Sequence, residues 1–131
     1  CLSRGLGDVY KRQVRSRTEA AEWAQALQDK YQAAVVLTGL SLTEGRLAVA
    51  CCQDGGTEFV EHDSVDGFFP GTGDIFTAVL LGELLRGGAL TASAAKAAAF
   101  VRRCIAYTAA KHSDPVYGVQ LEPLLGELLK A

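Results

Sequence analysis

A helical pattern that runs directly into a short apolar strand constrains the fold of this chain more than any other feature. Ser16 and Glu19 have the spacing of a helix capping box, and apolar residues then recur at helical intervals as far as Tyr31. Residues 33–38 form a short, β-branched apolar run closed by Gly39, which is typical of a strand buried on both faces of a parallel sheet. Because a helix feeding such a strand is the second half of a βαβ unit, we predict an α/β fold.

A β-hairpin is predicted next. Residues 47–53 and 57–62 are strand-like runs, and Asp54-Gly55-Gly56 between them is a strong hairpin signal. Antiparallel pairing at this point would end the sheet. Cys51 and Cys52 are adjacent in the first of these runs, so they should point to opposite faces of the sheet as small core residues.

Three helices are predicted after the hairpin. Residues 75–86 have a broad apolar face and stop at a Gly-Gly pair. Thr91 would cap a second helix from residue 92 to about residue 111, in which several alanines permit close packing, and residues 121–130 would form a short closing helix. The predicted order is helix, strand, hairpin and three helices, which makes an α/β layered half-sheet.

Composition excludes several classes of function. The chain has 131 residues, enough for one domain, and 49% of them are hydrophobic and 21% charged, as in soluble globular proteins. A net charge of -2 with scattered basic residues gives no footprint for nucleic acid. No apolar run is long enough to span a membrane, and the four cysteines lack metal-site spacing. We expect a reduced, cytoplasmic protein, because disulfides are rare in that compartment.

The first thirteen residues stand apart from the rest. Residues 1–13, CLSRGLGDVYKRQ, have no apolar period and resemble a translated adapter from a sequencing library. We expect this segment to be a scar without a fold or a function; the alternative is a disordered N-terminal arm. The scar interpretation predicts that the gene continues upstream and that residues 14–131 are the C-terminal part of a single domain.

The segment that carries chemistry opens the helix predicted at 75–86. Gly71 and Gly73 flank Thr72 at a helix start, which leaves backbone N–H groups open at the positive end of the helix dipole and makes an anion site. Asp74 then brings a carboxylate beside a bound phosphate, which is costly unless the carboxylate has a role or a cationic partner. The economical role is to accept the proton of a substrate hydroxyl that attacks the γ-phosphorus. On this fragment alone, a purely structural helix cap remains an alternative.

A longer run places the motif in a family. The segment PGTGDIFTA at 70–78, with LLG at 80–82 and the helix around Phe100 behind it, resembles the C-terminal signature of the ribokinase-like kinases. Within that superfamily it is most similar to the pyridoxal or pyridoxamine kinase branch, which has threonine between the two glycines, followed by Asp, a hydrophobic residue and Phe. Residues 114–122 are also similar to the C-terminal tail of bacterial members. The resemblance runs from about Val14 to the end of the chain.

The resemblance implies ATP- and Mg²⁺-dependent phosphorylation of the 5′-hydroxymethyl group of pyridoxal, pyridoxamine or pyridoxine, on a ribokinase-like, Rossmann-like fold. It implies that Asp74 is the catalytic base. It also implies an anion hole formed by the backbone N–H groups of Gly71, Thr72 and Gly73. Residues that match nucleotide contacts are Thr38, at the predicted C-terminal end of its strand, and Val65 and Phe69, whose alternative is core packing.

Other implications concern what the chain lacks. In this family the vitamin pocket, its lid and the acidic residues that help to place the metal lie mainly upstream, so we expect the chain alone to be inactive. We also expect the full-length protein to be a homodimer. One alternative is a hydroxymethylpyrimidine kinase, or another ribokinase-like kinase that acts on a hydroxymethyl group; Asp74 in its Pro-Gly-Thr-Gly context argues against these. An alternative of another class is a non-catalytic nucleotide-binding or structural module.

Overall fold

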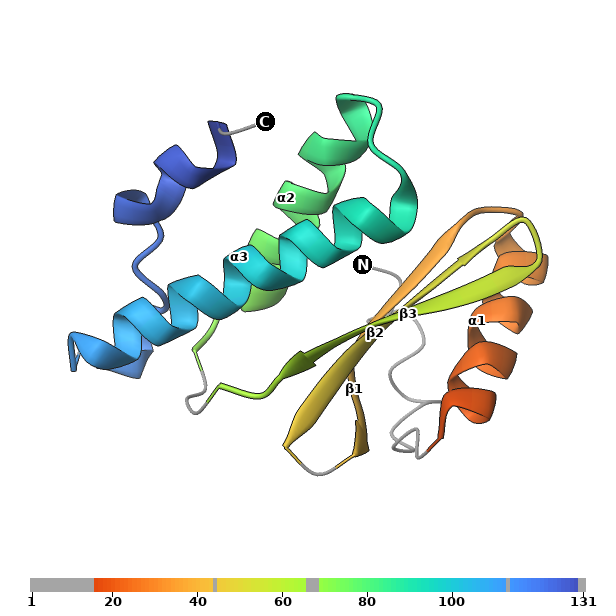
Figure 1. The fold of residues 1–131 in the computed structure, drawn as a ribbon, viewed down its shortest axis with the longest axis horizontal. Helices are drawn as coiled ribbons and strands as arrows, with labels where there is room; N and C mark the ends of the chain where they lie inside the picture. The colour runs from red at the N-terminus through yellow and green to blue at the C-terminus, as the bar shows by residue number, and fades with distance from the viewer. Residues whose placement is uncertain (1–15, 44, 66–68, 113, 130–131) are drawn as a thin grey trace.

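The computed structural model describes residues 16–43, 45–65, 69–112 and 114–129 (Figure 1). The expected scar at residues 1–13 lies outside the described residues. The elements in chain order are α1 (Arg17–Tyr31), β1 (Val35–Thr43), β2 (Arg46–Gln53), β3 (Gly56–Asp63), α2 (Thr72–Leu85), α3 (Leu90–Ala110) and two 3-10 helices, η1 (Pro115–Tyr117) and η2 (Glu122–Leu129). The predicted order of helix, strand, hairpin and helices is confirmed.

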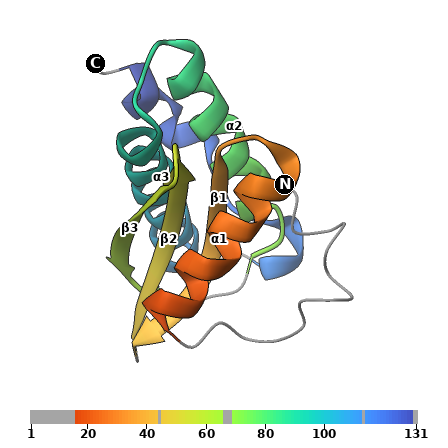
Figure 2. The ribbon, with the colours of Figure 1, turned by 90° about the vertical axis from the view of Figure 1, so that its right-hand side faces the viewer.

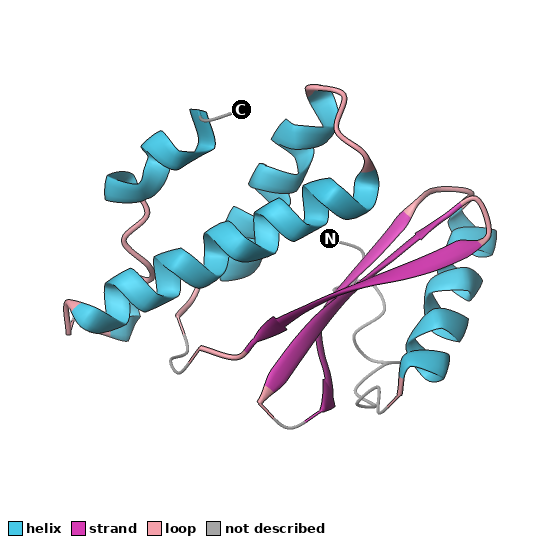
Figure 3. Ribbon diagram, viewed as in Figure 1, coloured by secondary structure: helices cyan, strands magenta, loops and turns pink. Residues whose placement is uncertain are grey.

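The molecule has three layers. The sheet lies between α1 on one face and the pair α2 and α3 on the other (Figures 1 and 2). α1 contacts all three strands, α3 crosses β2 and β3, and α2 packs chiefly on α3 (Figure 3). The α/β layered fold is therefore confirmed. Of the helices that the structure describes, none has the length and apolar character needed to cross a bilayer.

The sheet has the order β1-β2-β3, with β2 antiparallel to both neighbours. The predicted hairpin is confirmed: Asp54 and Gly55 join β2 to β3 with φ of 53° and 80°, the positive values that a tight two-residue hairpin turn requires. The parallel pairing predicted for β1 is not seen, because its pairing among the described residues is antiparallel, with β2. A strand whose two faces are both covered by helices has the same apolar sequence pattern whether the adjacent strand is parallel or antiparallel to it.

β1 is longer than predicted and contains a β-bulge. Thr38 and Gly39 together stand opposite the single residue Val49 of β2, and Gly39 has φ of 71°. The pairs that flank this irregularity are Leu37–Ala50 and Leu40–Ala48. The prediction that the strand ends at Thr38 is wrong, since the glycine marks a bulge inside the strand and not its end.

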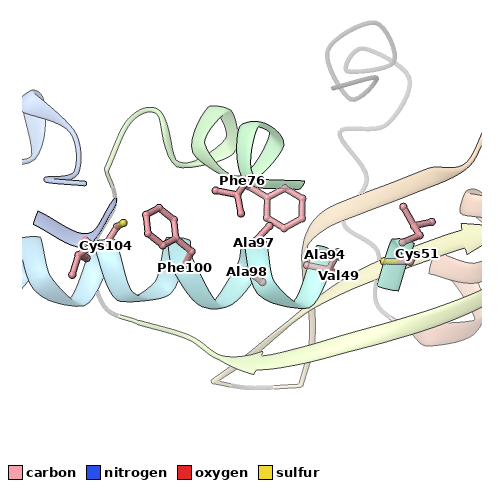
Figure 4. Close-up of a cluster of buried hydrophobic side chains, with 11 residues drawn as sticks. Val49, Cys51, Phe76, Ala94, Ala97, Ala98, Phe100 and Cys104 are labelled. Atoms are coloured by element: carbon pink, nitrogen blue, oxygen red, sulfur yellow. The ribbon is translucent and has the colours of Figure 1, made fainter. Parts of the chain in front are cut away.

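The core has one large part between the sheet and α3. Ala94 and Ala97 of α3 are fully buried, and Phe100 is 4% exposed (Figure 4). Cys51 joins this cluster, whereas Cys52 packs with residues of α1 and β1 on the opposite face. The prediction that the two cysteines face opposite layers is confirmed, and the small side chains on α3 let that helix approach the sheet closely.

Some helix ends differ from the prediction. Ser16 caps α1 as expected, with its Oγ accepting from Glu19 N at 3.1 Å. Thr91 does not cap α3: the N-cap is Ala89, in an extended conformation, and Thr91 lies in the first turn. The closing segment is a 3-10 helix and not an α-helix. Its Gly126 is a poor former of α-helix, and it buries only Leu124 among its leucines.

Candidate active site at the start of α2

The turn that opens α2 leaves its backbone donors uncovered. Gly71 is the N-cap, with φ of 87°, and no side chain caps the helix. The first helical hydrogen bond runs from Ile75 N to Gly71 O at 3.1 Å, so the N–H groups of residues 72–74 have no acceptor within the helix. These groups lie at the positive end of the helix dipole, which favours a bound anion.

The structure explains one of the two glycines of the turn but not the other. Gly71 has a left-handed backbone conformation, which residues with a side chain rarely adopt. Gly73 has no positive φ, and a Cβ atom added there would meet no atom within 4 Å. The described structure therefore gives no reason for glycine at position 73, where alanine would suit a helix better. An approaching ligand would supply that reason.

Asp74 is an exposed carboxylate in the first turn of α2. No hydrogen bond or ion pair from another described residue satisfies its side chain, and it does not bond back to the N-cap as in a capping box. The nearby hydroxyl of Thr77 donates elsewhere, to Gly73 O at 2.9 Å. The carboxylate thus lies beside uncovered backbone donors, without a cationic partner among the described residues.

The structure places the other predicted site residues on different elements. Thr38 is exposed at the bulge of β1, and no described hydrogen bond or ion pair joins it to the turn. Val65 is half-buried after β3. Phe69 is 5% exposed and immediately precedes Pro70 and the turn. The assignment of these three residues to nucleotide binding stays a prediction.

One contact at the turn was missed by sequence analysis. Gly118, which follows η1, lies against Pro70: a Cβ atom at position 118 would be 3.1 Å from the Pro70 carbonyl oxygen. Gly118 is far from the turn in the sequence, so no local pattern predicts their contact. The one available signal is a glycine soon after Pro115, a residue that breaks the helical pattern in the sequence.

A large hollow lies at the other end of the helical layer. Its volume is about 730 Å³, and it is lined by the end of the β2–β3 hairpin and the start of α3. It is one helix length, about 20 Å, from the turn. The ionisable side chains that line it include Asp54 and Glu58 but no Lys or Arg, so it is a poor place for phosphate groups.

The three cysteines that the structure describes are buried. Burial raises the pKa of the Cys51 thiol to about 11, which keeps it protonated at neutral pH. Burial also raises the pKa of Cys104. Both cysteines, like Cys52, are free and buried. Cys51 and Cys52 act as small core residues, as predicted, and Cys104 is buried in the same cluster as Cys51.

Comparison with known proteins gives the chain its family. The family model described as phosphomethylpyrimidine kinase matches residues 6–117. The chain belongs to the phosphomethylpyrimidine kinase family. The match includes part of the segment that we expect to be a scar, and the scar interpretation stays a prediction. A search of curated proteins finds no match.

Solved structures of related kinases share the fold. A Bacteroides thetaiotaomicron protein described as a phosphomethylpyrimidine kinase is 26% identical with a TM-score of 0.82, over 90% of this chain and 41% of its own. Lactobacillus plantarum pyridoxal kinase is 29% identical with a TM-score of 0.77, over 89% of this chain and 42% of its own. Entamoeba histolytica pyridoxal kinase, at 16% identity with a TM-score of 0.72 over 88% of this chain and 40% of its own, shares the fold alone.

These comparisons confirm the resemblance to ribokinase-like vitamin kinases. The chain spans about two fifths of the length of the structures it matches. Within the described residues, no group of three or more His, Cys, Asp and Glu side chains could hold a metal ion. Mg²⁺ sites that use substrate phosphates commonly take only one or two protein carboxylates.

Proposed function

We propose that the complete gene product carrying this chain is an ATP-dependent kinase that phosphorylates the 5′-hydroxymethyl group of a B6 vitamer. The observation that carries the proposal is Asp74: an exposed carboxylate, unpaired among the described residues, beside the uncovered N-terminus of α2. The family match and the kinases with this fold support phosphoryl transfer as the chemistry of this corner.

The proposed mechanism uses the turn as an anion hole. Backbone N–H groups of Gly71, Thr72 and Gly73 hold the γ-phosphoryl group, and preorganised donors of this kind contribute about 3–4 kcal/mol each to transition-state stabilisation. Asp74 accepts the proton of the substrate hydroxyl while the oxygen of that hydroxyl forms a bond to the γ-phosphorus. The bond from that phosphorus to the bridging oxygen breaks, and ADP leaves. Mg²⁺, when bound with ATP, would neutralise charge on the phosphates.

The choice of a B6 vitamer rests on the form of the turn and on two relatives. Thr72 between the glycines, followed by Asp74, is the form that resembles pyridoxal kinases. The chain is 29% identical to a pyridoxal kinase, and the Bacteroides thetaiotaomicron protein was also crystallised with pyridoxal. Phosphorylation of a hydroxymethylpyrimidine is the second candidate, and the description of the matching family supports it.

Substrate choice is proposed to lie outside this chain. A chain that spans about two fifths of its relatives carries the anion hole and the base in this proposal, while the vitamin pocket comes from the rest of the protein. We accordingly propose that residues 14–131 alone do not turn over pyridoxal. The complete protein is proposed to be a cytoplasmic homodimer.

Steady-state kinetics on the complete gene product test the proposal. ADP release is measured with ATP and Mg²⁺ on pyridoxal, pyridoxamine, pyridoxine and hydroxymethylpyrimidine. We expect the highest kcat/KM on a B6 vitamer. A higher value on hydroxymethylpyrimidine would favour the second candidate, and ATP binding without turnover of any of them would favour a non-catalytic nucleotide-binding module.

A further inference from the structure

The segment that follows α3 returns to the turn at the start of α2. Gly118 has φ of 72°, and its Cα faces the carbonyl of Pro70 so closely that a Cβ atom would be 3.1 Å from the oxygen. Such a contact is tighter than side chains normally make, so any larger residue would push the carbonyl by a few tenths of an ångström. Pro70 immediately precedes Gly71, the N-cap of α2.

A buried hydroxyl anchors this returning segment to α3. Thr108 is fully buried, and its Oγ1 accepts a hydrogen bond from Gln120 N at 2.8 Å. The same hydroxyl donates to Cys104 O at 2.7 Å. Both the donor and the acceptor functions of the side chain are used, so the position of residue 120 is fixed relative to the long helix.

The segment also has hydrogen bonds of its own. Asp114 accepts from Val116 N through its side chain at 3.0 Å and from Tyr117 N through its carbonyl at 3.1 Å. Gly118 N donates to Pro115 O at 3.0 Å. Residues 114–120, which we call the brace, therefore form a short hydrogen-bonded turn with one end bonded to α3 and its glycine against Pro70.

We propose that the brace sets the position of the anion-binding turn and that Gly118 is a positioning residue for phosphoryl transfer. This inference rests on the proposed function of the turn. α2 packs chiefly on α3, and its start has added support at Pro70. The brace supplies this support from the same helix that α2 packs on, so α3 holds the catalytic helix both along its length and at its start.

Two asparagine variants test this contact. Gly45 has φ of 75°, nearly the value of Gly118, and a Cβ atom there would meet nothing within 4 Å. Gly118 combines φ of 72° with ψ of -163°, a region of the backbone that is essentially restricted to glycine, so Gly118→Asn adds backbone strain to the contact with Pro70. In the complete gene product we expect Gly118→Asn to lower kcat about threefold to tenfold relative to Gly45→Asn, because small misplacements of a reacting group are expensive. KM for ATP and for the acceptor should match those of Gly45→Asn. Variants of Thr108 leave Gly118 unchanged and so separate support of the turn from that strain.

A second pair of variants tests the anchor to α3. Thr108→Val removes the hydroxyl that holds Gln120, and Thr108→Ser keeps it. We expect kcat to fall in the valine variant and to recover in the serine variant, with KM unchanged in both. Equal kcat in Gly118→Asn and Gly45→Asn would overturn the proposal, as would a serine variant no more active than the valine variant.

A readout that does not need turnover keeps the inference separate from the proposed function. Amide hydrogen exchange at Ile75 reports its bond to Gly71 O, the first of the helix. Gly118→Asn should accelerate exchange there, and Gly45→Asn should not. If the wild-type protein transfers no phosphate, the proposed function fails by itself, and unchanged exchange at Ile75 would then overturn the brace as well.

Discussion

Lys96 of α3 donates a hydrogen bond from Nζ to Oε1 of Glu83 on α2, over 2.9 Å. This bond lowers the pKa of the Glu83 carboxyl below its usual 4.5, and Arg86, 3.7 Å from the same oxygen, adds to the effect. The pair joins the helix that carries the turn to the helix that supports it. Because protonation of Glu83 removes its negative charge, the strength of this ion pair depends on pH.

The pH dependence of stability has a definite sign. Because the folded-state pKa of Glu83 lies below 4.5, its contribution is fully present above that pH and is lost as the pH falls through the folded-state value. The Tm of wild type should exceed that of Glu83→Gln at neutral pH, and the difference should shrink as the pH falls below 4.5. Lys96→Met should remove the same pH-dependent contribution to the Tm, because it removes the partner of Glu83. A difference that stays constant with pH would count against this pair.

Asp74→Asn should abolish most of the catalytic rate without unfolding the protein. A positioned base contributes about 10²–10⁴-fold, so a loss of that size in kcat is expected in the complete gene product. The side chain is exposed and unpaired among the described residues, so the Tm and the Kd for ATP should change little. Glu22→Gln on the exposed face of α1 is the matched control and should keep wild-type kcat. Near-normal turnover of Asp74→Asn would remove Asp74 from the role of base.

Gly73→Ala should separate folding from function. Since the added Cβ meets no described atom, alanine should leave the stability unchanged or raise it by up to about 1 kcal/mol through its better helix propensity. The same methyl group would stand where a phosphoryl group approaches, so kcat should fall by about tenfold or more. Gly82→Ala, at another open position of α2, should show the stability effect alone. Equal kcat in the two variants would mean that no ligand approaches Gly73.

Overpacking the interface of α3 with the rest of the core should destabilise the fold. Ala97 is fully buried in the cluster that also holds Phe76 and Phe100, so Ala97→Leu should lower the free energy of unfolding by about 1–3 kcal/mol. Ala99 is exposed on the same helix, and Ala99→Leu should change it by less than about 0.5 kcal/mol. Urea denaturation of both variants measures the contrast. Similar values would contradict the packing described for α3.

Features set by neighbouring residues could be predicted from the sequence. Ser16 and Glu19 form the cap of α1, and Asp54-Gly55 forms the hairpin turn, because each depends on residues close along the chain. The open turn before Asp74 belongs to the same class. These local rules correctly placed most of the elements.

Features set by distant residues could not be predicted. The direction of β1 depends on which strand lies beside it, and an apolar run does not record that choice. The contact of Gly118 with Pro70 depends on how the segment after α3 folds back. Thr91 has a good capping side chain, but the path of the chain out of the Gly87-Gly88 turn gives the cap to Ala89.

The bulge in β1 has a consequence for how this strand can change in evolution. Leu37 and Leu40 both pack towards α1 although three positions separate them, because Thr38 and Gly39 share one place in the ladder. Deleting Gly39 would restore regular alternation between Leu37 and Leu40, with both leucines still facing inwards. Packing would survive that deletion, and only the direction of Thr38 would change. Among relatives, a one-residue gap at this position should therefore accompany loss of the nucleotide contact predicted for Thr38, even where the surrounding apolar residues are kept.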